Sequence, residues 1–126
     1  MPSALSAYLV TQHENGFGKV HTLQRGTRYS IGRAPTNKIV LTDDLCSREH
    51  AEIYFAEGRW ILRDLGSLNG SKINGENVDG GEEGLSVGDE VQLGHSRFTF
   101  VEDLAQLPGV PGGEPAVNSA CVRFAR

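Results

Sequence analysis

Short stretches in which hydrophobic and polar residues alternate recur along most of the chain, and clusters of glycine, asparagine and other turn-forming residues separate them. Alternation with a period of two places successive side chains on opposite faces of a β-strand, so these stretches predict strands. Ala51, Ile53 and Phe55 share one expected face, and Trp60 and Leu62 are expected to point inward from the following strand. The clearest expected strands are residues 6–13, 19–25, 28–33, 38–41, 50–55, 59–64, 91–93 and 97–101.

Many short strands at close spacing, with no convincing helical period between them, predict an all-β fold. We expect an antiparallel β-sandwich of about eleven short strands, with binding loops at one end. Residues 76–84 are rich in glycine and glutamate and are expected to form an exposed connection. Residues 1–103 are expected to form the domain. Three of the five prolines lie between residues 107 and 115, which predicts a Pro/Gly-rich linker or flexible tail over 104–126.

The composition is typical of a soluble globular protein, because 38% of the 126 residues are hydrophobic and 22% are charged. This balance argues against disorder, and no apolar run is long enough to cross a bilayer. The N-terminal residues lack the basic and apolar regions of a signal peptide, which makes the cytoplasm the expected location. The formal net charge of -4 disfavours binding to nucleic acid or to an anionic membrane. Any anion site is therefore expected to be a small local patch.

The two cysteines, Cys46 and Cys121, are separated by most of the chain. We expect two free thiols, because this spacing fits neither a disulfide framework nor a pair of metal ligands. His13, His21 and His95 form no recognised zinc spacing with them, so no metal site and no cofactor are expected.

Residues 64–75 contain two Asn-Gly pairs directly after an apolar run. Glycine permits positive φ and lets a ligand approach the backbone, while short side chains such as Ser67 and Asn69 offer hydrogen-bond donors and acceptors. The segment therefore fits a loop that holds a polar ligand. Asn-Gly pairs also form ordinary hairpin turns, so the loop by itself leaves both interpretations open.

Two further polar segments stand at expected strand ends, Gly32-Arg33 and Ser47-Arg48-Glu49-His50. Loops at one end of a β-sandwich commonly form its binding surface, and we expect these segments and residues 67–70 to meet there. Together they supply guanidinium groups, hydroxyls, an amide and backbone N–H groups. An arginine fork can hold a phosphate bidentately, and hydroxyl and N–H donors can satisfy its remaining oxygens. The combination predicts a phosphate-binding site.

The order Gly32-Arg33, then Ser47-x-x-His50, then Asp64-Leu65-x-Ser67-x-Asn69-Gly70-Ser71-x-Ile73-Asn74-Gly75 closely resembles the forkhead-associated (FHA) domain family. Each motif is short, and their order and spacing together carry the resemblance, which covers roughly residues 8–102 on the usual scale of one domain. It implies a β-sandwich that recognises phosphothreonine peptides through arginine and neighbouring donors.

The resemblance implies ligand-binding roles for Arg33, Ser47, Arg48, Ser67, Leu68 and Asn69. Arg33 and Ser47 would contact the phosphate, with Arg48 beside them, and Asn69 would hold the peptide backbone next to the phosphothreonine. The residues implied to support the site are Gly32, His50, Gly70 and Asn74. Leu68 departs from the family pattern, because many relatives have threonine there. The lost hydroxyl implies weaker or differently shaped binding.

The function implied by the resemblance is that of a non-enzymatic, phosphothreonine-dependent module in a larger signalling or transcriptional regulatory protein. Its partner would be a Thr-phosphorylated protein or peptide, in trans or within the parent chain, produced by an upstream Ser/Thr kinase. No cofactor, nucleic acid or membrane is implied as a partner of this domain.

Two other functions stay open from the sequence. A phosphate-independent interaction or self-association domain is compatible with the apolar residues Leu45 and Leu68 near the motifs. A small hydrolase would use Ser47, His50 and Asp64 as a triad, but Ser47 lacks the Gly-x-Ser-x-Gly context of a nucleophile elbow.

Several of these residues also have simpler structural interpretations. Arg33 could form a surface ion pair with Asp43 or Asp44, and Arg48 could be an ordinary solvated charge. Trp60, Phe98 and Phe100 fit a hydrophobic core better than a stacking platform.

Overall fold

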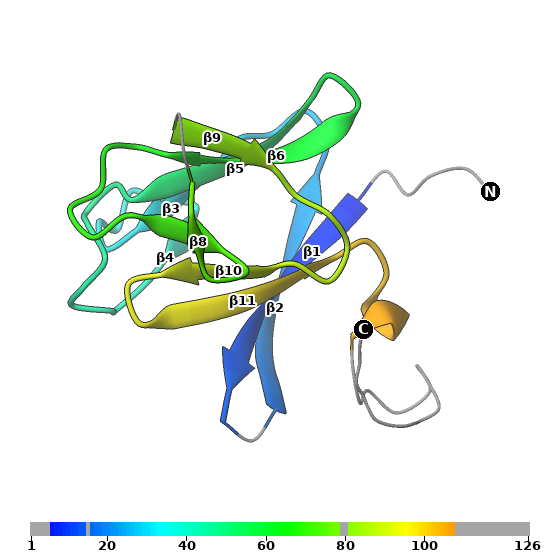
Figure 1. Ribbon diagram of the computed structural model, residues 1–126, viewed down its shortest axis with the longest axis horizontal. Coiled ribbons are helices and arrows are strands. Elements are labelled where there is room, and N and C mark those ends of the chain that lie inside the picture. Colours follow the sequence, from blue (N-terminus) through cyan, green and yellow to red (C-terminus); the bar gives the residue numbers. More distant parts are fainter. Residues whose placement is uncertain (1–5, 15, 79–80, 108–126) are drawn as a thin grey trace.

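Two β-sheets pack face to face in the computed structural model, which describes residues 6–14, 16–78 and 81–107 (Figure 1). The six-stranded sheet has the order β2-β1-β11-β10-β7-β8, and the five-stranded sheet has the order β4-β3-β5-β6-β9. The strands are β1 (Ser6–His13), β2 (Gly16–Gln24), β3 (Tyr29–Gly32), β4 (Ile39–Val40), β5 (Ala51–Ala56), β6 (Arg59–Asp64), β7 (Ser71–Ile73), β8 (Glu76–Asn77), β9 (Glu82–Gly84), β10 (Glu90–Leu93) and β11 (Ser96–Val101). The predicted all-β sandwich is confirmed. Within the described part of the chain, no helix has the length and apolar character that crossing a membrane requires.

Neighbouring strands pair antiparallel with one exception, because β3 and β4 run parallel. Ile31 lies opposite Ile39, and Gly32 lies opposite Val40. Because the two strands run in the same direction, the connection between them must return toward the start of β3 before β4 begins. Residues 33–38 make this connection as a compact loop at the end of β3.

The segment from β7 to β9 differs from the sequence-based expectation. β7 lies within the stretch expected to be a loop, and β8 and β9 lie within the expected exposed connection. Both β8 and β9 leave most of their side chains exposed and join their sheets by backbone pairing, as in Lys72 opposite Asn77. The described residues between 76 and 84 are thus largely exposed, as expected, but they also include two strands that the sequence did not indicate, because strands this short carry no hydrophobic alternation.

Large apolar side chains fill the space between the sheets. Trp60, Phe98 and Phe100 are almost fully buried, which confirms their expected place in the core. Phe55 packs edge to face against Trp60, with ring centroids 5.5 Å apart. The inward-facing positions Ala51, Ile53 and Leu62 of β5 and β6 are also buried. Their burial provides the main favourable free energy of folding.

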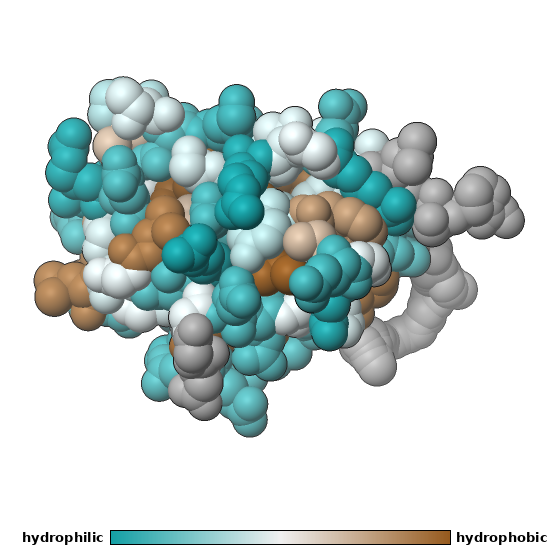
Figure 2. Space-filling model, turned by 90° about the horizontal axis from the view of Figure 1, so that it is seen from above, coloured by the Kyte–Doolittle hydropathy of each residue, from teal (hydrophilic) through white to brown (hydrophobic). Residues whose placement is uncertain are grey.

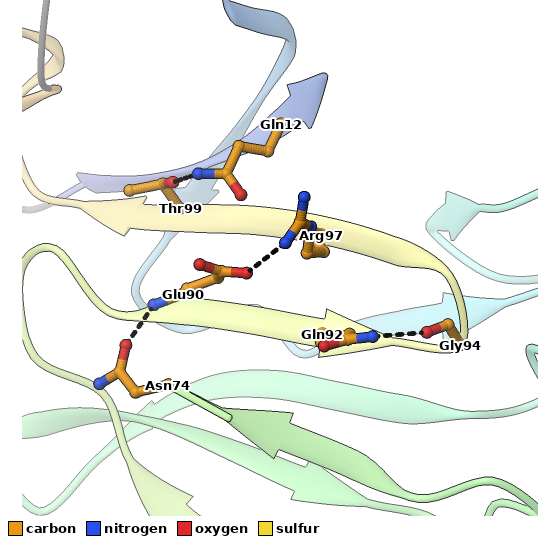
Figure 3. A network of polar contacts seen from close by, with 7 residues as sticks. All are labelled: Gln12, Asn74, Glu90, Gln92, Gly94, Arg97 and Thr99. Atoms are coloured by element: carbon orange, nitrogen blue, oxygen red, sulfur yellow. Dashed lines mark hydrogen bonds and ion pairs between the residues drawn. The ribbon is translucent and has the colours of Figure 1, made fainter. Parts of the chain in front are cut away.

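The outer face of the six-stranded sheet is polar over β10 and β11 (Figure 3). Arg97 Nη1 lies 3.4 Å from Glu90 Oε2, and the Glu90 N–H donates to Asn74 Oδ1 at 2.9 Å. On the neighbouring strands, Gln12 Nε2 donates to Thr99 Oγ1 at 3.4 Å. The exposed ion pair between Arg97 and Glu90 contributes little to stability. The polar side chains make this part of the face suited to contact with water.

A small apolar cluster covers the other end of the same outer face and extends past the expected end of the domain. The 3-10 helix η2 (Leu104–Gln106) leads into Leu107, which is only 5% exposed and packs with Val10 and Val101. The packed part of the chain thus includes the first residues of the predicted tail. Residues 108–126, the rest of that tail, lie outside the described residues.

Cys46 is a free, buried cysteine. Its Sγ donates to the Leu93 carbonyl oxygen at 3.2 Å. Burial, reinforced by the negative charge of Asp43, raises the pKa of the Cys46 thiol to about 12. The thiol therefore stays protonated at neutral pH and acts as a core residue. Cys121 lies outside the described residues.

Candidate functional site

Three loops meet at one end of the sandwich, as the sequence predicts (Figure 1). They follow β3, β4 and β6, and they comprise residues 33–38, 41–50 and 65–70. Backbone hydrogen bonds join the first two, because the N–H groups of Arg33 and Ala34 donate to the carbonyl oxygens of Ser47 and Arg48, each at 3.1 Å. We call these three segments the loop cluster.

Gly32 allows the first two loops to approach each other closely. A Cβ atom at this position would collide with the Arg48 carbonyl group and would lie 2.9 Å from Asn37 Nδ2. The need for glycine here arises from lack of space. This explains the expected supporting role of Gly32.

Arg33 presents its charge at the surface of the loop cluster. Its Nε donates to the Cys46 carbonyl oxygen at 2.6 Å, and the side chain is exposed. Among the described residues, no ion pair involves Arg33, so the possible pairing with Asp43 or Asp44 does not form. One anchored nitrogen therefore orients the guanidinium while its terminal nitrogens remain accessible.

Ser47 and Arg48 lie beside Arg33 in the folded chain, because backbone hydrogen bonds join the two segments. Ser47 Oγ accepts a hydrogen bond from the Leu68 N–H at 3.0 Å. A hydroxyl that accepts in this way keeps its own proton for donation to another group. The Arg48 side chain is exposed, which is compatible with either a ligand contact or a solvated charge.

Asp64 organises the third loop from inside. Its carboxylate accepts from the N–H groups of Gly66 and Ser67, both at 3.0 Å, and from the hydroxyls of Ser67 and Ser71, both at 2.6 Å. Partial burial opposes ionisation of Asp64, but the hydrogen bonds from Ser67 and Ser71 outweigh it and hold the pKa of the carboxyl below its usual value. Ser67 Oγ also accepts from the Gly70 N–H at 2.9 Å. The Ser67 hydroxyl is therefore engaged within the loop and positions it.

Leu68 and Asn69 form the tip of this loop. The Asn69 Nδ2 donates to the Leu45 carbonyl oxygen at 2.8 Å and so ties the third loop to the second. Asn69 Oδ1 forms no hydrogen bond with the rest of the described chain and can accept one from a ligand. The Leu68 side chain is 88% exposed. Next to them lies a shallow cavity of about 170 Å³, which Leu45, Asn69, Gly70, Lys72, Gln92 and Gly94 line.

His50 is fully buried beneath the loop cluster and connects two of its segments. Its Nδ1 accepts from the Ser47 backbone N–H at 3.1 Å, and its Nε2 lies 2.8 Å from the Gly70 carbonyl oxygen. Because a backbone N–H only donates and a carbonyl only accepts, this arrangement requires the proton on Nε2. Both ring nitrogens are occupied, which agrees with the structural role expected for His50. Gly70 itself adopts φ +80°, a region that favours glycine.

The same contacts exclude the arrangement that a serine hydrolase requires. In a catalytic triad the histidine accepts a hydrogen bond from the serine hydroxyl and donates one to the acid. Here His50 contacts the backbone of Ser47, and Asp64 is bonded to Ser67 and Ser71. Ser47, His50 and Asp64 therefore do not form a triad.

Asn74 lies apart from the loop cluster, although it was expected to support the site. It follows the far end of β7, adopts φ +53°, and bonds to Asp89 Oδ1 and to the Glu90 N–H, each at 2.9 Å. Asn74 therefore stabilises the turn before β10. The Asn-Gly pair at residues 74–75 acts as a hairpin turn, whereas the pair at residues 69–70 belongs to the loop cluster.

Sequence reasoning missed two residues that hold the loops in place. Asn37 Nδ2 donates to the carbonyl oxygens of Ala34 and Arg48, at 2.9 and 2.7 Å. An asparagine after Pro-Thr in a turn was a weak signal for such a role.

Asp43 is the second missed residue. It accepts from the Leu45 N–H at 2.8 Å, the His95 N–H at 2.6 Å and the Ser96 hydroxyl at 2.9 Å. Burial opposes its ionisation, but these hydrogen bonds and the charge of His95 lower the pKa of the Asp43 carboxyl overall. The local turn at Asp43 was detectable as an Asx-turn, whereas its contacts with the turn between β10 and β11 depend on the fold.

The fold and the loop cluster together define a β-sandwich recognition domain whose binding surface is built from loops at one end. The family model of the FHA domain matches residues 29–94, which include all three loops. The chain belongs to the FHA domain family, in agreement with the resemblance seen in its motifs.

Characterised relatives and a solved structure support this assignment. The chain is 40% identical over 101 residues to an oxoglutarate dehydrogenase inhibitor of Corynebacterium diphtheriae, a match that covers 80% of this chain and 68% of the relative. It is 41% identical over 101 residues to the glycogen accumulation regulator GarA of Mycolicibacterium smegmatis, covering 80% of this chain and 61% of GarA. The chain thus spans about two thirds of the length of these relatives. A structure solved in an analysis of phosphothreonine-dependent FHA domain interactions is 33% identical, with a TM-score of 0.64 over 75% of this chain and 95% of that chain.

Proposed function

We propose that this chain is a phosphothreonine-dependent peptide- and protein-binding module. The observation that carries the proposal is the Ser47 hydroxyl, which accepts the Leu68 N–H at 3.0 Å and therefore has its proton left for an outside acceptor. The Arg33 backbone N–H donates to the Ser47 carbonyl oxygen, and Arg33 Nε donates to the Cys46 carbonyl oxygen, so the exposed guanidinium is held against the backbone of the same loop. A phosphate group, with its negative charge and acceptor oxygens, fits a cation beside a directed hydroxyl.

Five of the six predicted ligand-binding residues have distinct roles in this proposal. Arg33 neutralises the phosphate charge and Ser47 donates to a phosphate oxygen, with Arg48 adding positive charge. Asn69 accepts from or donates to the peptide backbone beside the phosphothreonine. The Ser67 hydroxyl, which Asp64 and Gly70 already engage, acts through the shape of the loop.

The names of the two relatives support a regulatory role that is exerted by binding another protein. One is a dehydrogenase inhibitor and the other is a regulator of glycogen accumulation. We therefore place the module in a regulatory protein with a protein partner. The transcriptional role that the sequence suggested has no support in these names.

The ligand is proposed to come from outside this sequence. The threonines of the chain are Thr11, Thr22, Thr27, Thr36, Thr42 and Thr99. All of them lie within the strands and loops of the domain itself. A phosphothreonine ligand thus comes from another protein or from a segment beyond these 126 residues, after phosphorylation by a Ser/Thr kinase.

The test is a calorimetric titration of the whole chain with matched peptides that carry threonine, phosphoserine or phosphothreonine. We expect binding to the phosphothreonine peptide and a marked loss of affinity for the threonine peptide. Arg33→Ala or Ser47→Ala should each weaken phosphothreonine binding about tenfold or more, because a hydrogen bond to a charged group contributes about 1.5 to 3 kcal/mol.

Arg59→Ala and Ser86→Ala are matched controls. Both residues are exposed and lie near the strand ends opposite the loop cluster, so their replacement should leave the affinity unchanged. Equal affinity for the threonine and phosphothreonine peptides would overturn the proposal and favour a phosphate-independent interaction domain.

A further inference from the structure

Exposed leucines are concentrated in the loop cluster. Leu45, Leu65 and Leu68 are 39%, 36% and 88% exposed, and we call them the leucine rim. The other exposed large hydrophobic residues of the described chain are dispersed over other elements: Val20, Val40, Val87 and Leu104. Figure 2 shows hydrophobic side chains reaching the surface at the end of the sandwich where the loops lie, on the left in that view. Exposed apolar side chains gathered among polar loops of this kind are typical of binding surfaces.

Leu68 is the most exposed member of the rim, and its backbone is held in place. Its N–H donates to Ser47 Oγ at 3.0 Å. Its neighbours are anchored as well, because Ser67 Oγ donates to Asp64 at 2.6 Å and Asn69 Nδ2 donates to the Leu45 carbonyl oxygen at 2.8 Å. The Leu68 side chain therefore projects from a braced loop into solvent, where it gains almost nothing from packing within the domain.

We infer that Leu68 is a specificity-determining residue, which packs against an apolar side chain of the ligand directly next to the phosphothreonine. This inference rests on the proposed function. The Leu68 N–H bonds to the same hydroxyl that is proposed to donate to the phosphate, so the Leu68 backbone lies beside the proposed phosphate position. Consecutive Cα atoms of an extended peptide are about 3.8 Å apart, and a neighbouring ligand residue therefore comes within reach of Leu68.

The chemistry of the leucine side chain determines which kind of ligand residue binds favourably next to it. An alkyl side chain cannot donate to a phosphate or pair with a charge, so burial of apolar surface is the favourable contribution it can make. An apolar ligand neighbour would be buried against Leu68, while an acidic neighbour would lose hydration without gaining a partner. Burial of most of a leucine side chain corresponds to about a tenfold gain in affinity.

The experiment uses phosphothreonine peptides in which the residues before and after the phosphothreonine are replaced in turn by leucine, alanine or aspartate. The whole chain is titrated with each peptide, as are Leu68→Ala, Leu68→Thr and the control Val87→Ala, which alters an exposed apolar residue outside the loop cluster. We expect the unmodified chain and Val87→Ala to bind one leucine-containing peptide about tenfold more tightly than its alanine counterpart. In both Leu68 variants this ratio should fall to about one.

Two results would overturn the inference while leaving the proposed function intact. One is a phosphothreonine-specific domain with no preference for an apolar neighbour at either position. The other is a Leu68→Ala variant that loses the same factor of affinity for every peptide, since that would indicate a general contact. Equal binding of unphosphorylated peptides would overturn the proposed function and this inference together. Thermal unfolding of each variant checks that the fold is retained, as expected for a side chain that is 88% exposed.

Discussion

Hydrogen bonds within the loop cluster orient three candidate ligand-binding side chains and leave part of their bonding capacity unused. Arg33 is anchored through Nε, Ser47 through the lone pairs of Oγ, and Asn69 through Nδ2. Each anchor costs the side chain one bonding position and removes conformational freedom before the ligand arrives. A site that is ordered in advance binds more tightly, because less entropy is lost on association.

Asp64 makes the stability of the domain depend on pH. Hydrogen bonds hold its pKa below the usual value of a carboxyl group against the opposing effect of burial. A carboxyl whose pKa is depressed in the folded state stabilises the fold above its unfolded pKa, and this contribution is lost as the pH falls through the folded pKa. We expect the free energy of unfolding to decrease below about pH 4, and Asp43, whose pKa is also lowered, acts in the same direction.

Asp64→Asn should lower the free energy of unfolding at pH 7 by about 1 to 3 kcal/mol and should reduce the loss of stability on acidification. Urea unfolding at several pH values, followed by the fluorescence of Trp60, the one tryptophan of the chain, measures both effects. The exposed Asp44 supplies the matched control, Asp44→Asn. An unchanged pH dependence in Asp64→Asn would show that another carboxylate controls the acid transition.

At the scale of elements, the loop cluster is assembled from strand ends that lie far apart in the sequence. The end of β3 meets the loop before β5 through backbone hydrogen bonds. The loop after β6 in turn joins the loop before β5 through Ser47 and Leu45. His50 fills the space below and links the second loop to Gly70. The sheets therefore supply a rigid frame on which short loops keep a defined shape.

Gly32→Ala tests whether the close approach of the first two loops matters. The added methyl group would collide with the backbone carbonyl of Arg48, which cannot move without disturbing the loop. We expect a loss of about 1 to 3 kcal/mol in the free energy of unfolding, measured by urea denaturation, together with weaker phosphopeptide binding.

Gly84→Ala is the matched control for Gly32→Ala. The atoms nearest to its methyl group would be those at the flexible end of the Arg59 side chain, which can move aside. Equal destabilisation by the two substitutions would show that the contact between Gly32 and Arg48 has no special importance.

On the scale of the whole molecule, the ligand-binding end and the apolar cluster around Leu107 are separate. The loop cluster lies where β6 and β10 end and β11 begins, whereas Leu107 packs near the last residue of β11, against Val101. The Leu107 cluster is also separate from the hydrophobic core between the sheets. Stability and ligand binding can therefore be altered independently at the two ends of the molecule.

Leu107→Ala is expected to destabilise the domain by about 1 to 2 kcal/mol, because the buried leucine loses most of its contact with Val10 and Val101. The phosphopeptide affinity should stay the same. Urea unfolding and calorimetric titration of the full chain measure the two quantities. Leu104→Ala, at a half-exposed position of η2, is the control and should have a much smaller effect on stability.

Much of the fold could be predicted from hydrophobic alternation. β1, β5, β6 and β11 bury alternate side chains in the core, and their expected ranges agree with the structure to within a few residues. β7, β8 and β9 could not be predicted, because they are two or three residues long and are defined by backbone pairing. The residue types in these strands show no pattern from which that pairing could be predicted.

The sequence by itself determined the alternating strands, the family and the chemical groups of the loop cluster, because these depend on residue type, order and local spacing. Only the tertiary structure decided how these groups are used. It placed Asn69 in the loop cluster and Asn74 at a distant turn, although both begin an Asn-Gly pair. It also engaged the Ser67 hydroxyl with Asp64 while leaving the Ser47 proton available. The physical reason is that a hydrogen bond depends on which groups the folded sheets bring together, and residues as distant as Asp43 and Ser96 meet only in the folded chain.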